Sequence, residues 1–292
     1  MVSVIIPTFN RRTRLPRAVE SVRGQTFQDW ELIVIDDGST DDTAEWLSGL
    51  REPRLRYLRT PHRGVSHARN IGIAAARHPW LAFLDSDDAW HPRKLATQLE
   101  ALESEDDRYL LCHTEEIWIR RGRRVNPRLR HRKYSGWVYR PSLDLCVISP
   151  SSVLLHRSVL ESFGMFDETY PVCEDYELWL RITTHLPVLF VPQPLTVKYG
   201  GHSDQLSHSR WGLDRYRVRA LLSRLCSGEL TFQQQVWTRR ALAEKAAILA
   251  RGYANRGKPG PAAAYARLAS RCRTLPVEIW EPPRRRRSVA TA

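Results

Sequence analysis

Apolar runs of strand length alternate with amphipathic segments of helix length over the first 110 residues. The predicted strands lie at 2–6, 31–36, 55–59 and 80–85, and the predicted helices at 15–22, 38–50 and 64–77. In the first of these helices the apolar residues recur on one face, at Leu15, Ala18, Val19 and Val22. The alternation predicts an α/β fold with a mostly parallel central sheet flanked by helices. Ligands of such folds bind beyond the carboxyl ends of the strands.

The alternation loosens after residue 110. We expect strands near 109–119 and 151–156, a basic and turn-rich stretch between them, and a helix that begins near Glu174. From about residue 211 the pattern is helical and rich in arginine, with a break near 257–261. The predicted domains are an α/β domain at 1–205 with halves 1–110 and 111–205, a basic helical extension at 206–280 and a disordered basic tail at 281–292.

Composition narrows the class of protein. The 292 residues are 42% hydrophobic, enough for a sizeable core, yet no apolar run approaches the roughly 18 residues of a membrane span. The N-terminus lacks the pattern of a secretory signal, so we expect a cytoplasmic protein. The five cysteines form no C-x-x-C pair, which predicts reduced thiols and argues against a zinc ribbon.

The formal net charge of +13 is distributed unevenly. Residues 1–110 carry 15 basic and 17 acidic side chains, residues 111–205 carry 12 and 10, and residues 206–292 carry 18 and 5. The whole excess therefore belongs to the last third of the chain. The basic character concerns the helical extension and not the acidic motifs that precede it.

Three carboxylates follow the predicted strand at 80–85, namely Asp85, Asp87 and Asp88. Their mutual repulsion would raise their pKa values unless a cation or several donors offset it. Such an oxygen-rich cluster suits Mg²⁺ or Mn²⁺. The same residues also match the caps of a helix that opens near Pro92. Local spacing leaves metal binding and capping open.

A second acidic group follows the strand at 31–36. Asp36 and Asp37 stand at the strand end, where a carboxylate can accept hydrogen bonds from a base or a ribose. Asp41 and Asp42 are expected to cap the following helix. On the helix at 64–77, spacing alone favours a solvated Arg69.

Two later motifs have both a structural and a functional interpretation. Glu174 and Asp175 open a helix, where they are either a capping pair or a general base at the edge of a cleft. His202 follows two glycines that let the backbone approach a ligand closely. It is either an ordinary polar loop residue or a metal or phosphate ligand.

The strands, helices and acidic motifs described above, in the order in which they occur along the chain, resemble those of the family 2 glycosyltransferases of the GT-A fold. These enzymes move a sugar from a nucleotide-diphosphate sugar to an acceptor hydroxyl. The matching text is "VSVIIPTFNR", "AVESVRGQTFQDWELIVIDDGSTDDT", "GVSHARNIGIAAARHPWLAFLDSDDAWHPRKL", "FDETYPVCEDYELWLRI" and "GGHSDQLS". The resemblance covers roughly the first 205 residues and implies a nucleotide-binding half followed by an acceptor-side half. The Q-x-x-R-W signature of processive members is missing, so we expect a non-processive bacterial type.

The resemblance also implies which residues hold the donor. Pro7 and Asp37 would border the pocket of the nucleotide base, and Arg69 would contact the base or a phosphate. Asp85 and Asp87 occupy the D-x-D positions that hold ribose and a divalent metal, either Mn²⁺ or Mg²⁺.

The remaining roles concern the reaction itself. Asp175 matches the catalytic base of an inverting displacement, with Glu174 beside it. His202 matches a position that can complete the metal shell. Asp88 adjoins the D-x-D motif without an assigned role.

The implied partners are a nucleotide-diphosphate sugar, with a UDP-sugar favoured, and a glycan or lipid-linked acceptor in bacterial cell-surface glycan biosynthesis. The basic extension leaves open a peripheral contact with anionic lipid at the inner face of the plasma membrane. Nucleic acid is not an expected partner, because no helix-turn-helix, RRM or OB signature accompanies the charge. A nucleotidyltransferase would need a glycine-rich loop that "PTFNRRTRL" lacks. The alternative is a glycosyltransferase-like scaffold that binds nucleic acid or membrane without activity.

Overall fold

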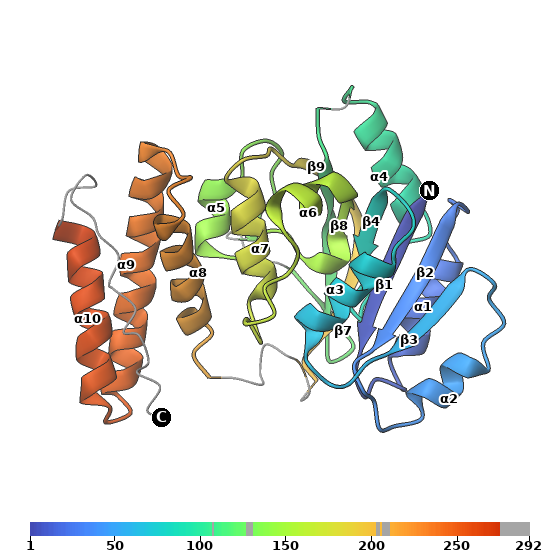
Figure 1. Cartoon of the computed structure of the whole chain (residues 1–292), viewed down its shortest axis with the longest axis horizontal. Helices are drawn as coiled ribbons and strands as arrows, with labels where there is room; N and C mark the ends of the chain where they lie inside the picture. Colours follow the sequence, from blue (N-terminus) through green and yellow to red (C-terminus); the bar gives the residue numbers. More distant parts are fainter. Residues whose placement is uncertain (107, 127–130, 203–204, 206–210, 275–292) are drawn as a thin grey trace, which may run out of the picture. The chain divides into compact units, whose positions relative to one another are not determined.

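The computed structural model describes residues 1–106, 108–126, 131–202, 205 and 211–274 (Figure 1). The chain divides into two compact units, Met1–Trp211 and Gly212–Ala292. The tail predicted to be disordered, at 281–292, lies outside the described residues. All five cysteines are free thiols, as the sequence predicts.

The described strands of the first unit form one sheet in the order β3-β2-β1-β4-β8-β6-β9-β5, and β7 pairs with β6 (Figure 1). Their bounds are β1 Val2–Thr8, β2 Trp30–Asp36, β3 Leu55–Arg59, β4 Trp80–Phe83, β5 Ala89–Trp90, β6 Leu111–Arg120, β7 Arg123–Val125, β8 Val153–His156 and β9 Leu189–Gly200. Strands β1 to β4 run parallel, β8 pairs antiparallel with both β4 and β6, and β6 pairs parallel with β9. The sheet is thus parallel in its first half and mixed in its second.

Helices cover both faces of this sheet (Figure 1). Those of the first unit are α1 Leu15–Arg23, α2 Thr43–Ser48, α3 Val65–Ala75, α4 Lys94–Glu103, α5 Tyr139–Asp144, α6 Arg157–Phe163 and α7 Glu174–Thr183, with a 3-10 turn, η2, at Pro150–Ser152. Val2, Val4 and Ile6 of β1 belong to one apolar cluster together with α1 and α4, whereas Ile5 belongs to a second cluster with α3 and α7. The alternation of side chains along a buried strand explains these two core layers.

Helix α3 approaches β1 closely at Gly72. A Cβ atom at this position would lie 2.4 Å from Cγ2 of Ile5, which is shorter than any real carbon contact. Glycine therefore lets α3 press against the sheet, and this packing fixes the start of α3 near the carboxyl ends of the strands.

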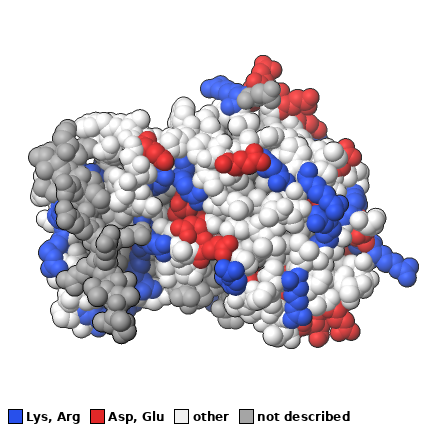
Figure 2. Space-filling model, in the orientation of Figure 1, with Lys and Arg blue, Asp and Glu red and all other residues white. Residues whose placement is uncertain are grey.

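The second unit contains α8 Asp214–Cys226, α9 Phe232–Ala254 and α10 Pro259–Thr274. Helix α9 begins with a capping box, in which Thr231 and Gln234 bond each other's backbone N–H groups. The Tyr253 and Tyr265 rings of α9 and α10 stack with centroids 5.6 Å apart. No described helix combines the length and apolar character needed to cross a membrane. On the visible face of the first unit, basic and acidic side chains are interspersed (Figure 2).

Candidate active site

The carboxyl ends of three neighbouring strands meet at one edge of the sheet. Thr8 of β1 pairs in register with Asp36 of β2, and Ile5 of β1 pairs with the last residue of β4, Phe83. Both acidic motifs predicted from the sequence follow these strand ends. Pro7 lies in β1 at the same edge, paired with Ile35.

The first acidic cluster, Asp36 and Asp37, is buried and bonded mainly by the backbone. Asp36 accepts the Ser39 N–H at 2.7 Å and the Tyr57 hydroxyl at 2.8 Å. Asp37 accepts the N–H groups of Arg63 and Gly64, both at 2.8 Å. These carboxylates therefore fasten the turn after β2 and the loop before α3. Burial, and then the hydrogen bond to Asp36 and the charge of that carboxylate, raise the pKa of Tyr57 to about 12.

Gly38 permits this turn for two reasons. Its φ of 83° favours glycine, and a Cβ atom there would lie 2.9 Å from the backbone nitrogen of His62. Beside the turn, the rings of Phe9 and His62 stack with centroids 4.0 Å apart. Neither Phe9 nor His62 was predicted as a site residue. The sequence signal that could have indicated this ring pair is a phenylalanine, Phe9, directly after the first strand. Asp41 does fasten the start of α2 by accepting the Thr43 N–H at 3.2 Å, whereas Asp42 makes no side-chain cap.

Arg69 is buried, at 3% exposure, so the expectation of a solvated arginine is wrong. Its guanidinium donates to Asp85 Oδ1 and to Glu174 Oε1, both at 2.7 Å. Burial would lower the pKa of Arg69, but the two carboxylates outweigh it and raise that pKa above its usual value. One side chain of α3 thereby joins the loop after β4 to the first turn of α7.

The second acidic cluster, Asp85, Asp87 and Asp88, is held by remote segments. The Ser151 hydroxyl accepts the Asp85 N–H at 3.1 Å and donates to Asp88 Oδ2 at 2.6 Å. The N–H of Tyr199 in β9 donates to Asp88 Oδ1 at 3.1 Å. Helix α4 begins at Lys94 without a side-chain cap. The capping interpretation of this cluster is therefore wrong, including for Asp88, which instead ties the loop to η2 and β9.

The three carboxylates of this cluster differ in their protonation energetics. Burial raises the pKa of Asp87, and the neighbouring charge of Asp85 raises it further. Burial also raises the pKa of Asp88 well above its usual value. For Asp85, burial is outweighed by Arg69 and Lys198, which lower its pKa. The charged forms of Asp87 and Asp88 are thus disfavoured by burial and by neighbouring carboxylates, and an added cation would favour them.

His202 lies against the same cluster, with its Nε2 at 3.0 Å from Asp87 Oδ2. Among the described residues, no three His, Cys, Asp or Glu side chains form a group that could hold a metal alone. A carboxylate and an imidazole do fit an ion such as Mn²⁺ or Mg²⁺ that completes its shell with phosphate oxygens and water. The donor set therefore suits a metal that is shared with a bound diphosphate.

Glu174 and Asp175 open α7 directly after Cys173, whose φ of 61° is a left-handed conformation rare outside glycine. Glu174 is paired with Arg69, and burial raises its pKa more than the arginine lowers it. Asp175 Oδ1 accepts the Tyr176 N–H at 2.7 Å. Within the described part of the chain, its Oδ2 accepts no hydrogen bond. Asp175 thus partly caps the helix while one oxygen stays available.

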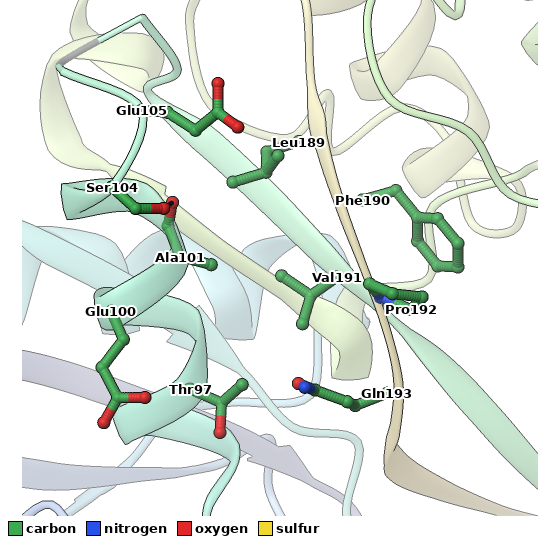
Figure 3. Close-up of a pocket in the computed structure, with 10 residues that line it drawn as sticks. All are labelled: Thr97, Glu100, Ala101, Ser104, Glu105, Leu189, Phe190, Val191, Pro192 and Gln193. Carbon is green, nitrogen blue, oxygen red and sulfur yellow. Dashed lines mark hydrogen bonds between the residues drawn. The ribbon is translucent and has the colours of Figure 1, made fainter.

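A separate groove of about 340 Å³ lies between α4 and the start of β9. Figure 3 shows its two walls facing each other, with Thr97, Glu100, Ala101, Ser104 and Glu105 on the α4 side and residues 189–193 on the strand. None of the sequence-predicted site residues lines it. The groove is therefore distinct from the acidic site described above.

A comparison with known protein families decides the family. The model described as "Glycosyl transferase family 2" matches residues 3–164. The chain belongs to glycosyltransferase family 2. This match includes both acidic clusters and Arg69, so the resemblance stated from the sequence is confirmed.

Curated relatives cover only part of this family 2 chain. An uncharacterized glycosyltransferase of Rickettsia felis is 34% identical over 184 residues, which are 63% of this chain but only 30% of that protein. The Escherichia coli UDP-Glc:alpha-D-GlcNAc-diphosphoundecaprenol beta-1,3-glucosyltransferase WfaP is 32% identical over 187 residues, 62% of this chain and 70% of that enzyme. This chain thus spans less than a third of the Rickettsia relative.

Solved structures of other proteins share the fold of this family 2 chain. Staphylococcus aureus TarS 1–349 in complex with UDP-GlcNAc matches with a TM-score of 0.66 at 15% identity, over 91% of this chain and 90% of that 1–349 chain. The Pyrobaculum calidifontis mannosyltransferase PcManGT, in complex with GDP-Man and Mn²⁺, matches with a TM-score of 0.60 at 17% identity, over 93% and 84%. The predicted fold class, GT-A with a helical C-terminal extension, is confirmed.

Proposed function

We propose that the chain is an inverting glycosyltransferase that moves a sugar from a nucleotide-diphosphate sugar to an acceptor hydroxyl. The observation that carries the proposal is the double ion pair of Arg69. It connects the D-x-D loop, through Asp85, to the helix start that presents Asp175, through Glu174. A donor site and a candidate base thus share one buried anchor, as a displacement between two bound substrates requires.

The proposed reaction is a single displacement. Asp175 accepts the proton of the acceptor hydroxyl through its available Oδ2 while that oxygen attacks the anomeric carbon. The bond from this carbon to the diphosphate oxygen breaks on the opposite side, which inverts the configuration. Arg69 keeps Asp85 and Glu174 in place throughout. A divalent ion held by Asp87 and His202, with Asp85 alongside, would neutralise charge on the departing diphosphate.

The proposed donor and acceptor are those for which two relatives are named. The E. coli relatives WfaP and WfgD are named for UDP-Glc and for a diphosphoundecaprenol-linked GlcNAc, which supports a UDP-sugar donor and a lipid-linked acceptor in bacterial cell-surface glycan synthesis. Under this proposal, Pro7 and Asp37 border the base pocket and the first unit is the catalytic domain. The basic second unit would hold the protein at the anionic inner face of the plasma membrane.

The test of the proposal is the Asp175→Asn variant. Removing a general base typically slows turnover by about 10²- to 10⁴-fold, while this isosteric change should leave the unfolding midpoint unaltered. The assay would follow transfer from UDP-glucose to GlcNAc-diphosphoundecaprenol, and chelation by EDTA should abolish it reversibly. Asp42→Asn is the matched control, because Asp42 is exposed and makes no side-chain cap. Near wild-type transfer by Asp175→Asn would show that another group is the base, and transfer in excess EDTA would refute the metal.

A further inference from the structure

Lys198 lies in the site but has no part in the mechanism above. Its strand, β9, pairs with β5 directly after the acidic loop, and the next residue, Tyr199, bonds Asp88. Side chains two residues apart on a strand point to the same face. Lys198 therefore shares the face of Thr196, whose hydroxyl lies 3.3 Å from the Ser151 carbonyl oxygen. This is the face on which Ser151 holds the second acidic cluster.

Four carboxylates interact electrostatically with the Lys198 ammonium: Glu116, Asp88, Asp85 and Asp175. Three of these carboxylates already have a partner that is nearer than Lys198. Glu116 pairs with Lys133, Asp88 accepts the Ser151 hydroxyl, and Asp85 pairs with Arg69. Among the described residues, no hydrogen bond or ion pair ends on the Lys198 ammonium, and the residue is half-buried. An ammonium carries three donors and accepts nothing. These donors are therefore open to a ligand in the middle of the site.

The side chain is also held in its charged form. Burial would lower the pKa of Lys198, but the four surrounding carboxylates outweigh it and raise that pKa above its usual value. Arg69, which is buried, has both terminal nitrogens committed to Asp85 and Glu174. A diphosphate that enters among these acids would meet repulsion unless a cation with open donors faces it.

We propose that Lys198 is a phosphate ligand of this site, which binds a phosphoryl oxygen of a substrate through its open N–H donors. The inference rests on the proposed function, because it presumes that a diphosphate enters among the acids. The phosphoryl group comes from the nucleotide donor or from the diphosphate of a lipid-linked acceptor. Both present the same oxygens, and separate binding measurements distinguish them.

The experiment compares Lys198→Met and Lys198→Arg with the wild type by isothermal titration calorimetry in the presence of Mn²⁺. The probes are UDP and GDP, their nucleosides uridine and guanosine, inorganic pyrophosphate, and a short-chain alkyl diphosphate that carries GlcNAc. For Lys198→Met we expect about 10- to 100-fold weaker binding of the diphosphate that uses this subsite, as for the loss of a charge-assisted hydrogen bond. Nucleoside binding should not change, and Lys198→Arg should recover most of the affinity.

Lys133→Met is the matched control, because Lys133 is a buried lysine whose ammonium already pairs with Glu116 at 3.3 Å. If Lys198 served only as a counter-charge, both methionine variants would lower the unfolding midpoint and neither would change diphosphate affinity. Unchanged affinity of Lys198→Met for every diphosphate would overturn the proposal. If the wild type bound pyrophosphate but no nucleotide, the proposed donor would be wrong while the pyrophosphate measurement still decided the role of Lys198.

Discussion

The two acidic clusters at the edge of the sheet are held by different kinds of partner. Asp36 and Asp37 accept three backbone N–H groups, from Ser39 and from the loop at 63–64, beside two side chains, the Tyr57 hydroxyl and the His62 ring. In the second cluster, Asp85 pairs with the Arg69 side chain, and Asp88 accepts the Ser151 hydroxyl together with one backbone N–H, from Tyr199. A backbone donor is fixed by the path of the chain, whereas a side chain can exchange its partner for a ligand. We therefore expect the first cluster to shape the site and the second to react to what enters it.

The largest expected effect comes from removing the anchor of the second cluster. Arg69→Met would leave Asp85 and the buried Glu174 without their common cation, which typically costs about 3–5 kcal/mol of unfolding free energy. Chemical denaturation measures this loss. The control is Arg63→Met, because the Arg63 side chain is 60% exposed and should contribute little. Adding Glu174→Gln to Arg69→Met should recover part of the stability. A stable Arg69→Met protein would mean that the second cluster does not depend on the Arg69 side chain.

The same substitution in each cluster should separate shape from ligand binding. Asp37→Asn places an amide against two N–H donors and should cost about 1–3 kcal/mol of stability. Asp87→Asn should leave stability nearly unchanged, because the charge it removes is already disfavoured by burial and by Asp85. It should abolish the metal-dependent rise in melting temperature on adding UDP or GDP. Thermal unfolding with and without Mn²⁺ measures both. The reverse pattern would refute the distinction between the clusters.

The smallest expected effect is the pH dependence of the first cluster. The folded-state pKa of Tyr57 is raised from 10.0 to about 12, so its contribution to stability is complete below about pH 10. The contribution is lost as the pH rises toward 12, because the unfolded chain releases this proton first. Tyr57→Phe should cost about 1 kcal/mol at neutral pH. The difference between wild type and variant should shrink between pH 10 and 12. Urea unfolding at both ends of this range measures the difference, and a constant value would contradict the Asp36 contact.

Local pattern predicted the first half of the fold well. The helix expected at 64–77 is α3, Val65–Ala75, and the strand expected at 55–59 is β3. Strand β9 was not predicted, because Pro192 and Pro194 interrupt its pattern. The structure accommodates them through register shifts against β6, where Pro194 pairs with Glu115. Short-range periodicity cannot reveal such a strand.

The site was predictable as a set of residue types but not as a network. Spacing marked Asp85, Asp87 and Glu174, since each follows a strand or opens a helix. It gave no signal for the burial of Arg69, whose partner Glu174 lies 105 positions away. Lys198 was not predicted for the same reason, because the carboxylates around it come from three distant segments: β6, the loop after β4, and α7. Long-range electrostatics depends on topology that local spacing does not contain.

The contact between Gly72 and Ile5 links two positions that are far apart in the chain. Because a methyl group at 72 would overlap Cγ2 of Ile5, alanine at 72 requires a smaller residue at 5, and valine would still carry the obstructing carbon. The side-chain volumes at positions 5 and 72 are therefore coupled, so that an increase at one position requires a decrease at the other. In directed evolution of this scaffold, a larger residue at position 72 should therefore appear only together with, or after, a smaller residue at position 5.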